Sequence, residues 1–283
     1  MTVRVPPPHV PMDRVRAAAN RAMAIGPTPD LFSVEDVVLA QADVRVPARL
    51  YRPVDHGGDE AIVFCHGGGF VWGSLDTHDG LCRRMARATG KVVVSIDYRL
   101  SPEEPYPAAE TDVVCAVRAV LAGAVAGLER GCRVSLSGDS AGGYLARHAA
   151  LALAGETTKL ARLVLVYPAL DPECRAPSHR RNAEGPVLTS EAMKWFWSAH
   201  GIGRNPRTPA DRPLDGGLRV FVLAAELDPL HDEAQAFAAD LAGSGIDVDF
   251  TTAAGMVHGF LSLEIPPDLR EHWEALIFRA LID

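Results

Sequence analysis

The stretch Gly138-Asp139-Ser140-Ala141-Gly142-Gly143 decides how the rest of the chain is interpreted. It follows a short apolar run, Val134–Ser137, and opens a segment with helical spacing, Ala141–Ala154. A G-x-S-x-G pattern between a strand and a helix is typical of a nucleophile elbow, a sharp turn that exposes a reactive serine. The glycines of the pattern let neighbouring backbone approach closely. A glycine-rich turn whose serine only caps the helix is the alternative.

Strand-like and helix-like segments alternate along the chain on both sides of this stretch. Short, nearly continuous apolar runs are typical of strands covered on both faces, and they occur at Ala61–Cys65, Val92–Ile96, Val134–Ser137, Leu163–Val166 and Leu218–Ala224. Segments with helical spacing are Asp79–Thr89, Ala108–Leu121, Ala141–Ala154, Asp232–Ala242 and Leu269–Leu281. An antiparallel edge pair, Val34–Ala40 with Val44–Tyr51, and a late strand, Asp247–Thr252, complete the pattern. It predicts an α/β fold with a mostly parallel sheet and helices on both faces.

Two stretches interrupt this alternation. Residues 1–33 begin rich in proline and become helical in pattern around Val15–Ile25. Residues 172–213 are rich in Pro, Arg and Gly around one helical segment, Ser190–His200. Long connections inside a compact domain usually carry function, often as lids. We therefore predict one catalytic domain, 34–283, with a cap over the carboxyl ends of its strands that is formed by 1–33 and an insertion at about 172–213.

A second motif, His66-Gly67-Gly68-Gly69-Phe70, directly follows one of the predicted strands. When a serine attacks a carbonyl group, negative charge builds on the carbonyl oxygen, and preorganised backbone N–H groups usually hold that charge. Consecutive glycines give a bare, bent backbone whose amides can point into a cavity. We predict an oxyanion hole formed by the amides of Gly68, Gly69 and Ala141, with His66 ordering the loop. A flexible tight turn is the alternative.

A nucleophilic serine needs a base, and the base needs a carboxylate that fixes its tautomer and orientation. Each partner should follow one of the last strands, in the order serine, acid, histidine. Asp228 follows the run that ends at Ala224, and His258 follows the late strand, so Ser140, Asp228 and His258 are the predicted triad. The remaining candidates are Glu226, Asp232 and Glu233 for the acid, and His56, His179 and His231, which lie off the expected positions.

These motifs together resemble a known family. The chain carries, in order, HGGGF at 66–70, DYRLSPEEPYPAAE at 97–110, GDSAGG at 138–143, AELDPLHDE at 225–233 and HGF at 258–260. From about Val34 onward it is similar to the hormone-sensitive-lipase family of esterases, the bacterial family IV. The resemblance implies an α/β-hydrolase fold with an eight-stranded sheet and a helical cap. It also implies hydrolysis of short- to medium-chain esters without a cofactor, and homodimers as an available assembly.

The pocket beside Ser140 is expected to be apolar. Residues close in sequence to the motifs are its predicted walls: Phe70, Trp72, Leu230, Met256 and Phe260. The helix of the insertion is predicted either to close the pocket or to pack on the body through Met193, Trp195, Phe196 and Trp197. Tyr144 stands where the family commonly has a small polar residue, so it is expected to alter the pocket.

The same triad supports other reactions and roles. It can transfer an acyl group to an alcohol, or close or open a lactone, when a dry pocket holds an acceptor. An α/β-hydrolase fold can also serve as a ligand receptor, because a fold does not fix a function. Receptors of this kind tend to lose a triad member, and a peptidase would be expected to carry an added domain. A carboxylesterase is therefore the first interpretation, and a biosynthetic acyl transferase or lactone enzyme is the second.

Composition narrows the partners and the compartment. The chain of 283 residues has a formal net charge of -8, which argues against nucleic acid and an anionic membrane surface as partners. No apolar run reaches the ~18 residues of a membrane helix, and the N-terminal segment lacks the apolar core of a signal peptide. The five scattered cysteines predict neither disulfides nor a metal site. We expect a cytoplasmic protein that binds a small-molecule ester and no metal.

Overall fold

A sheet of eight strands forms the centre of the computed structural model, in the order β1-β2-β4-β3-β5-β6-β7-β8. The structure describes residues 2–7, 9–23, 28–54, 57–156, 159–203, 214 and 217–283. The strands are β1 (Ser33–Gln41), β2 (Val44–Arg52), β3 (Glu60–Cys65), β4 (Val92–Ile96), β5 (Arg133–Asp139), β6 (Leu160–Val166), β7 (Arg219–Leu227) and β8 (Val248–Val257).

Strand pairing is antiparallel at the β1 edge of the sheet and parallel from β4 to β8. β1 pairs with β2, and β2 with β4, in antiparallel register. All later neighbours are parallel, from β4 and β3 to β7 and β8. The middle strands are nearly continuous runs of buried apolar residues, because helices cover them on both faces. The predicted α/β-hydrolase architecture is confirmed.

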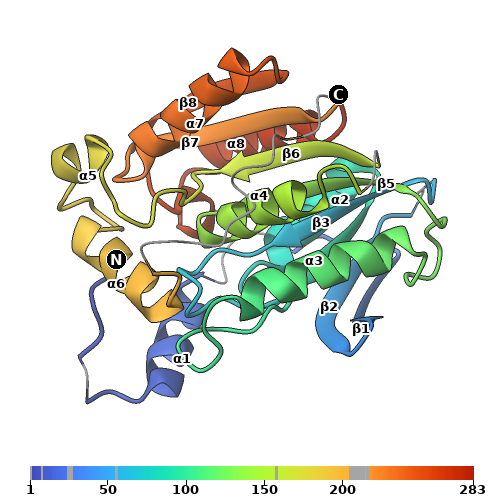
Figure 1. Cartoon of the computed structure of the whole chain (residues 1–283), viewed down its shortest axis with the longest axis horizontal. Helices are drawn as coiled ribbons and strands as arrows, with labels where there is room; N and C mark the ends of the chain where they lie inside the picture. The colour runs from blue at the N-terminus through green and yellow to red at the C-terminus, as the bar shows by residue number, and fades with distance from the viewer. Residues whose placement is uncertain are drawn as a thin grey trace.

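Helices cover the two faces of this sheet (Figure 1). α3 (Ala108–Leu121), α4 (Ala141–Leu153) and α7 (His231–Gly243) pack on one face, and α2 (Asp79–Thr89) and α8 (Pro267–Ala280) pack on the other. Each layer has its own cluster of buried apolar side chains. Because both faces are covered, a site can form only at the strand ends or edges.

The helices α1 (Met12–Met23), α5 (Ser178–Arg181) and α6 (Ser190–His200) gather at one end of the sheet (Figure 1). Arg16 of α1 donates to the carbonyl oxygen of Val71 at 2.7 Å and pairs with Glu103. His200 of α6 lies with its Nε2 atom 2.9 Å from Oε1 of Glu110. Of the predicted cap, residues 1, 8, 24–27 and 204–213 lie outside the described residues.

Two strands run further than the sequence indicates. β7 continues to Leu227 and β8 to Val257, and these two residues still pair with each other. Their last residues include Ala-Ala-Glu and Ala-Ala-Gly-Met, which lack the β-branched and aromatic side chains that favour strands. The extension places Asp228 and His258 directly at the two strand ends.

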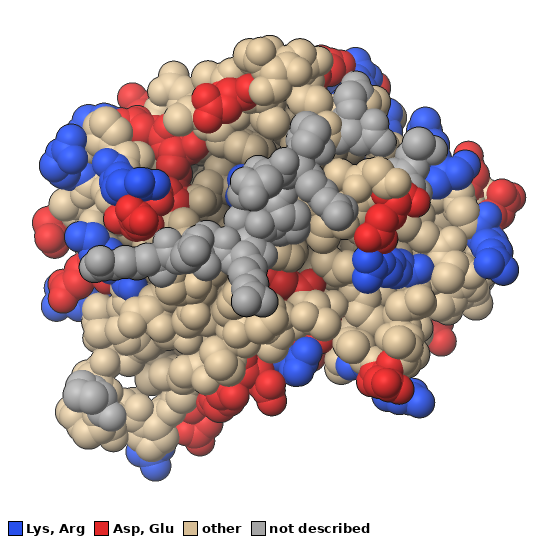
Figure 2. Space-filling view, in the orientation of Figure 1, with Lys and Arg blue, Asp and Glu red and all other residues tan. Residues whose placement is uncertain are grey.

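On the face of the molecule that Figure 2 shows, charged side chains of both signs are intermixed. Figure 2 shows acidic and basic side chains next to one another along the rim of this face. Arg181 pairs with Asp232 at 2.7 Å, and Arg118 pairs with Glu156 at 2.8 Å. Among the described helices, none combines the length and the apolar character that a membrane crossing requires.

Candidate active site

Ser140 lies between β5 and α4 in a strained turn. Its φ of +55° and ψ of -121° fall in a region that residues with a side chain rarely adopt. The turn is tight at Gly142, where a Cβ atom would lie 2.0 Å from the carbonyl oxygen of Cys65. The Ser140 amide donates to the carbonyl oxygen of Val166 at 2.9 Å, which ties the turn to β6. These contacts hold the serine at the end of the sheet, as the elbow motif predicts.

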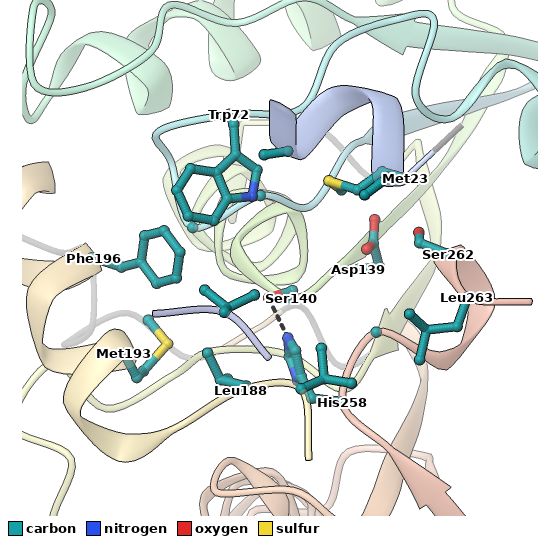
Figure 3. Close-up of a pocket in the computed structure, with 17 residues that line it drawn as sticks. Met23, Trp72, Asp139, Ser140, Leu188, Met193, Phe196, His258, Ser262 and Leu263 are labelled. Carbon is teal, nitrogen blue, oxygen red and sulfur yellow. Dashed lines mark hydrogen bonds between the residues drawn. The ribbon is translucent and has the colours of Figure 1, made fainter. Parts of the chain in front are cut away.

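Ser140, His258 and Asp228 form one hydrogen-bonded line. Oγ of Ser140 lies 2.9 Å from Nε2 of His258 (Figure 3). Nδ1 of His258 lies 2.7 Å from Oδ2 of Asp228, which is fully buried. The other carboxylate oxygen, Oδ1, accepts the amide hydrogen of Leu230 at 2.9 Å. A carboxylate that accepts the Nδ1 proton leaves the Nε2 lone pair facing the serine hydroxyl.

The other candidates for the acid and the base have different partners. The rival carboxylates are bound by other groups, Glu226 by the amide of Gly255, Asp232 by Arg181 and Glu233 by His179. Of the remaining histidines, His231 lies against Asp232, His179 against Glu233, and His56 is outside the described residues. Among the four acids considered, only Asp228 contacts His258.

The loop after β3 passes beside Ser140. Gly68 and Gly69 have φ values of +127° and +61°, and both line the cavity that contains Ser140. Within the described part of the chain their amides donate no hydrogen bond. The amide of Ala141 begins α4 and so has no carbonyl partner inside the helix. A Cβ atom on Gly69 would lie 2.2 Å from the ring of Phe196, so glycine is required there.

A buried polar network joins this loop to the elbow. Oδ1 of Asp139 accepts the amide hydrogen of Gly67 at 2.8 Å and lies 3.2 Å from Nε2 of His78. Burial raises the pKa of the Asp139 carboxyl, but the contacts with His78 and Gly67 lower it more, so the net pKa lies below the usual value. Tyr98 donates its hydroxyl hydrogen to the carbonyl oxygen of His66 at 2.7 Å. Burial lowers the pKa of His66 to about 4, so this ring is neutral at pH 7.

A cavity of about 110 Å³ opens beside Ser140 (Figure 3). Most of its walls are apolar, and the apolar side chains come from the body and from both parts of the predicted cap: Val3, Ala19, Ala22, Met23, Trp72, Val187, Leu188, Met193, Phe196 and Leu263. Besides Ser140 and His258, two polar side chains line it, those of Asp139 and Ser262. The cavity is therefore suited to an apolar group next to a reactive serine.

The structure differs from the sequence in the residues that form this wall. Of the five residues predicted as walls, Trp72 lines the cavity, whereas Phe70, Leu230, Met256 and Phe260 do not. Tyr144 and Trp195, which were also expected to affect the pocket, do not line it either. Phe70 has a φ of +66° and stacks on His200 at 4.0 Å, with Tyr144 edge-on at 5.5 Å. Leu230 belongs to one of the two core clusters, and Met256 packs against the other. Closeness to a motif in sequence does not fix the direction of a side chain in a turn.

The helix of the insertion, α6, both lines the cavity and packs on the body, the two roles considered for it. Met193 and Phe196 line the cavity. Trp197 is buried against Phe70 at 5.0 Å between ring centroids, and Trp195 stacks on Trp72 at 6.2 Å. The helix thus contacts the cavity with one face and packs on the body with another.

The N-terminal helix contributes wall residues that the sequence analysis did not identify. Ala19, Ala22 and Met23 recur at the spacing of one helical face. Val3, which precedes this helix, also lines the cavity, and its amide N–H donates a hydrogen bond to the carbonyl oxygen of Val187 at 2.6 Å. The apolar face of this helix was a usable signal. Ser262 and Leu263 gave no such signal, because they follow the histidine motif in a short turn.

Within the described part of the chain, no group of three or more His, Cys, Asp or Glu side chains could hold a metal ion.

Comparisons with known proteins identify the family of this chain. The family model described as the alpha/beta hydrolase fold matches residues 62–262. An ethyl acetate hydrolase of Pseudomonas putida is 34% identical over 261 residues, which cover 86% of this chain and 80% of that protein. The solved Pyrobaculum calidifontis esterase is 31% identical with a TM-score of 0.88, covering 99% of this chain and 95% of that one.

A second solved structure, described as an esterase from the bacterial hormone-sensitive lipase family, is 29% identical. It superimposes with a TM-score of 0.83 and covers 98% of this chain and 92% of that one. The family resemblance that the sequence motifs indicate is confirmed. The chain belongs to the α/β-hydrolase fold family and, within it, to the hormone-sensitive-lipase family.

Proposed function

We propose that the protein is a carboxylesterase that hydrolyses esters with short- to medium-chain acyl groups through an acyl-enzyme on Ser140. One observation carries this proposal. The line from Ser140 Oγ through His258 to Asp228, with distances of 2.9 Å and 2.7 Å, opens on an apolar cavity. Beside it lie the amides of Gly68 and Gly69, which donate no hydrogen bond to any described residue. The names of the relatives, which include an ethyl acetate hydrolase and carboxylesterases, support ester hydrolysis.

Acylation begins with proton transfer from Ser140 Oγ to Nε2 of His258 as the oxygen attacks the ester carbonyl carbon. Asp228 stabilises the resulting imidazolium, because its buried carboxylate contacts Nδ1 at 2.7 Å. The amides of Gly68, Gly69 and Ala141 hold the negative charge on the tetrahedral oxygen. His258 then donates its proton to the leaving alcohol oxygen, and the carbon–oxygen bond of the ester breaks.

Deacylation repeats these steps with water. His258 takes a proton from a water molecule as its oxygen attacks the acyl carbon. The same three amides stabilise the second oxyanion, and His258 returns the proton to Ser140 Oγ as the carboxylic acid leaves. Close packing at Gly142 and the hydrogen bond from the Ser140 amide to the carbonyl oxygen of Val166 hold the turn that presents the serine.

The size of the cavity supports a preference for short acyl groups. An engineered protein cavity of about 150 Å³ holds a benzene-sized molecule, and the cavity beside Ser140 measures about 110 Å³. We propose that residues 1–33 and 172–213 form a cap, because Val3, Met23, Leu188 and Phe196 close the cavity over Ser140. Longer acyl chains then require movement of this cap.

The cysteines support a cytoplasmic location as part of this proposal. Cys65, Cys82, Cys115, Cys132 and Cys174 are all free and buried. Thiols persist in a reducing compartment, whereas disulfides accumulate in oxidising ones. The homodimer that the family resemblance implies stays a prediction, which light scattering of the purified protein tests.

Hydrolysis of p-nitrophenyl esters of increasing acyl length tests the proposed function. The native protein should turn over acetate and butyrate esters rapidly, and Ser140→Ala should lose at least about 10³-fold in kcat. Ser244→Ala is the matched control, because this exposed hydroxyl donates to the carbonyl oxygen of Asp240 within its own helix end and does not line the cavity. A folded native protein that turns over none of these esters would refute the esterase and favour an acyl transferase or lactone enzyme.

A further inference from the structure

Relative to Ser140, the cavity wall has an apolar side and a side on which polar side chains lie next to the apolar Met23 and Leu263, called here the polar side (Figure 3). Phe196 and Met193 lie on one side of the serine. Asp139 and Ser262 lie on the other. In an otherwise apolar cavity, a carboxylate and a hydroxyl on one wall give the two sides different preferences for a ligand.

The polar side is the side of the leaving alcohol in the proposed reaction. His258 must reach the alcohol oxygen to protonate it, so the alcohol departs beside the imidazole. Ser262 follows His258 by one short turn, in which the amide of Ser262 donates to the carbonyl oxygen of Gly259 at 2.8 Å. Gly259 and Ser262 both line the cavity together with His258. The acyl chain then extends toward the apolar side.

The polar groups on this side have unused hydrogen-bonding capacity. Oδ1 of Asp139 accepts from Gly67 and lies near His78, whereas Oδ2 accepts no hydrogen bond from any described residue. The Ser262 hydroxyl likewise has no hydrogen-bond partner among the described residues, and this side chain is half-buried. Polar groups that lose water without gaining a partner cost free energy. A ligand that supplies a hydrogen-bond donor at this position removes that cost.

We propose that Asp139 and Ser262 are specificity-determining residues that select esters whose alcohol part carries a further hydroxyl, such as monoesters of diols and polyols. This inference rests on the proposed esterase function. Oδ2 of Asp139 accepts the hydrogen of the substrate hydroxyl, and the Ser262 hydroxyl donates to its oxygen. An alkyl alcohol of the same length leaves both groups unpaired when it displaces water from the wall.

Two esters of matched length test this selection. In 3-hydroxypropyl butyrate the terminal hydroxyl takes the place of the terminal methyl of butyl butyrate, so their ratio of kcat/KM reports on the hydroxyl contacts. Ser262→Ala should lower this ratio by about three- to tenfold, the value of one hydrogen bond. Ser262→Thr keeps a hydroxyl and should retain most of the native ratio. Ser244→Ala is again the control.

Asp139→Asn provides an independent variant. Its amide oxygen can still accept the Gly67 amide hydrogen, whereas an N–H donor replaces Oδ2 at the cavity, so the ratio should fall here too. A purely structural effect on the oxyanion loop would lower both rates equally and leave the ratio unchanged. The inference is overturned if Ser262→Ala and Asp139→Asn both keep the native ratio while the native protein hydrolyses both esters. A native protein that hydrolyses neither ester overturns the proposed function itself.

Discussion

Replacing Asp228 by Asn should reverse the proton arrangement of the whole catalytic line. Oδ1 of Asp228 must accept from the Leu230 amide at 2.9 Å, so the amide oxygen of the new side chain takes that position. The amide nitrogen then faces Nδ1 of His258, where a carboxylate oxygen lay at 2.7 Å. Nδ1 has to accept a hydrogen bond, the ring proton moves to Nε2, and Ser140 loses its base.

The expected loss in kcat for Asp228→Asn is about 10⁴-fold, or about 5 kcal/mol in activation free energy. The full burial of Asp228 supports a loss of this size, because water cannot replace the missing acceptor. Steady-state hydrolysis of p-nitrophenyl butyrate measures it, and thermal unfolding shows that the variant is folded. Asp232→Asn is the matched control, because this nearby carboxylate pairs with Arg181 instead. A variant that keeps more than a tenth of the native kcat refutes the assignment.

Three further substitutions test the loop, the cavity and the buried histidine. Gly69→Ala should lower kcat by about 10²-fold, because its Cβ atom would lie 2.2 Å from the Phe196 ring at a φ of +61°; Gly245→Ala, at a φ of +80° with open space around it, should keep native activity. Phe196→Ala should enlarge the cavity and raise kcat/KM for octanoate relative to butyrate esters, and an unchanged ratio would contradict its place in the wall. Lowering the pH from 6.5 to 4 should reduce the free energy of unfolding by about 3 kcal/mol through His66. The imidazole takes up a proton near pH 6.5 in the unfolded chain but only near pH 4 in the folded one, so acid favours the unfolded state. Urea unfolding at both pH values should show that His66→Asn loses less stability than the native protein, and equal losses would contradict this pH dependence.

The sheet and the triad could be predicted because local sequence controls them. A buried strand needs a continuous apolar run, and the turn at Ser140 needs Gly142 next to the backbone of Cys65. Asp228 and His258 were found by their order after the strands, which the fold fixes. The strand ends were less accurate, since Ala225 and Ala253 carry small side chains and still continue β7 and β8.

The cavity wall could not be predicted because distant segments build it. Val3 and Met23 meet Leu188 and Phe196 over the serine, and no local pattern relates these positions to one another. Phe70 is the opposite case, because it lies in the HGGGF motif but does not line the cavity. Its ring stacks on that of His200, with 4.0 Å between the ring centroids. Side-chain direction in such a turn depends on the backbone angle and on the helices that pack over it.

The most direct test of the central claim is the chemical identity of the nucleophile. The protein is mixed with p-nitrophenyl butyrate, quenched in acid within one turnover, and digested for peptide mass analysis. We expect a butyryl group on Ser140, and no label on the same peptide from Ser140→Ala. Rapid hydrolysis with the butyryl group on another residue, or equal labelling of the Ser140→Ala protein, would contradict it.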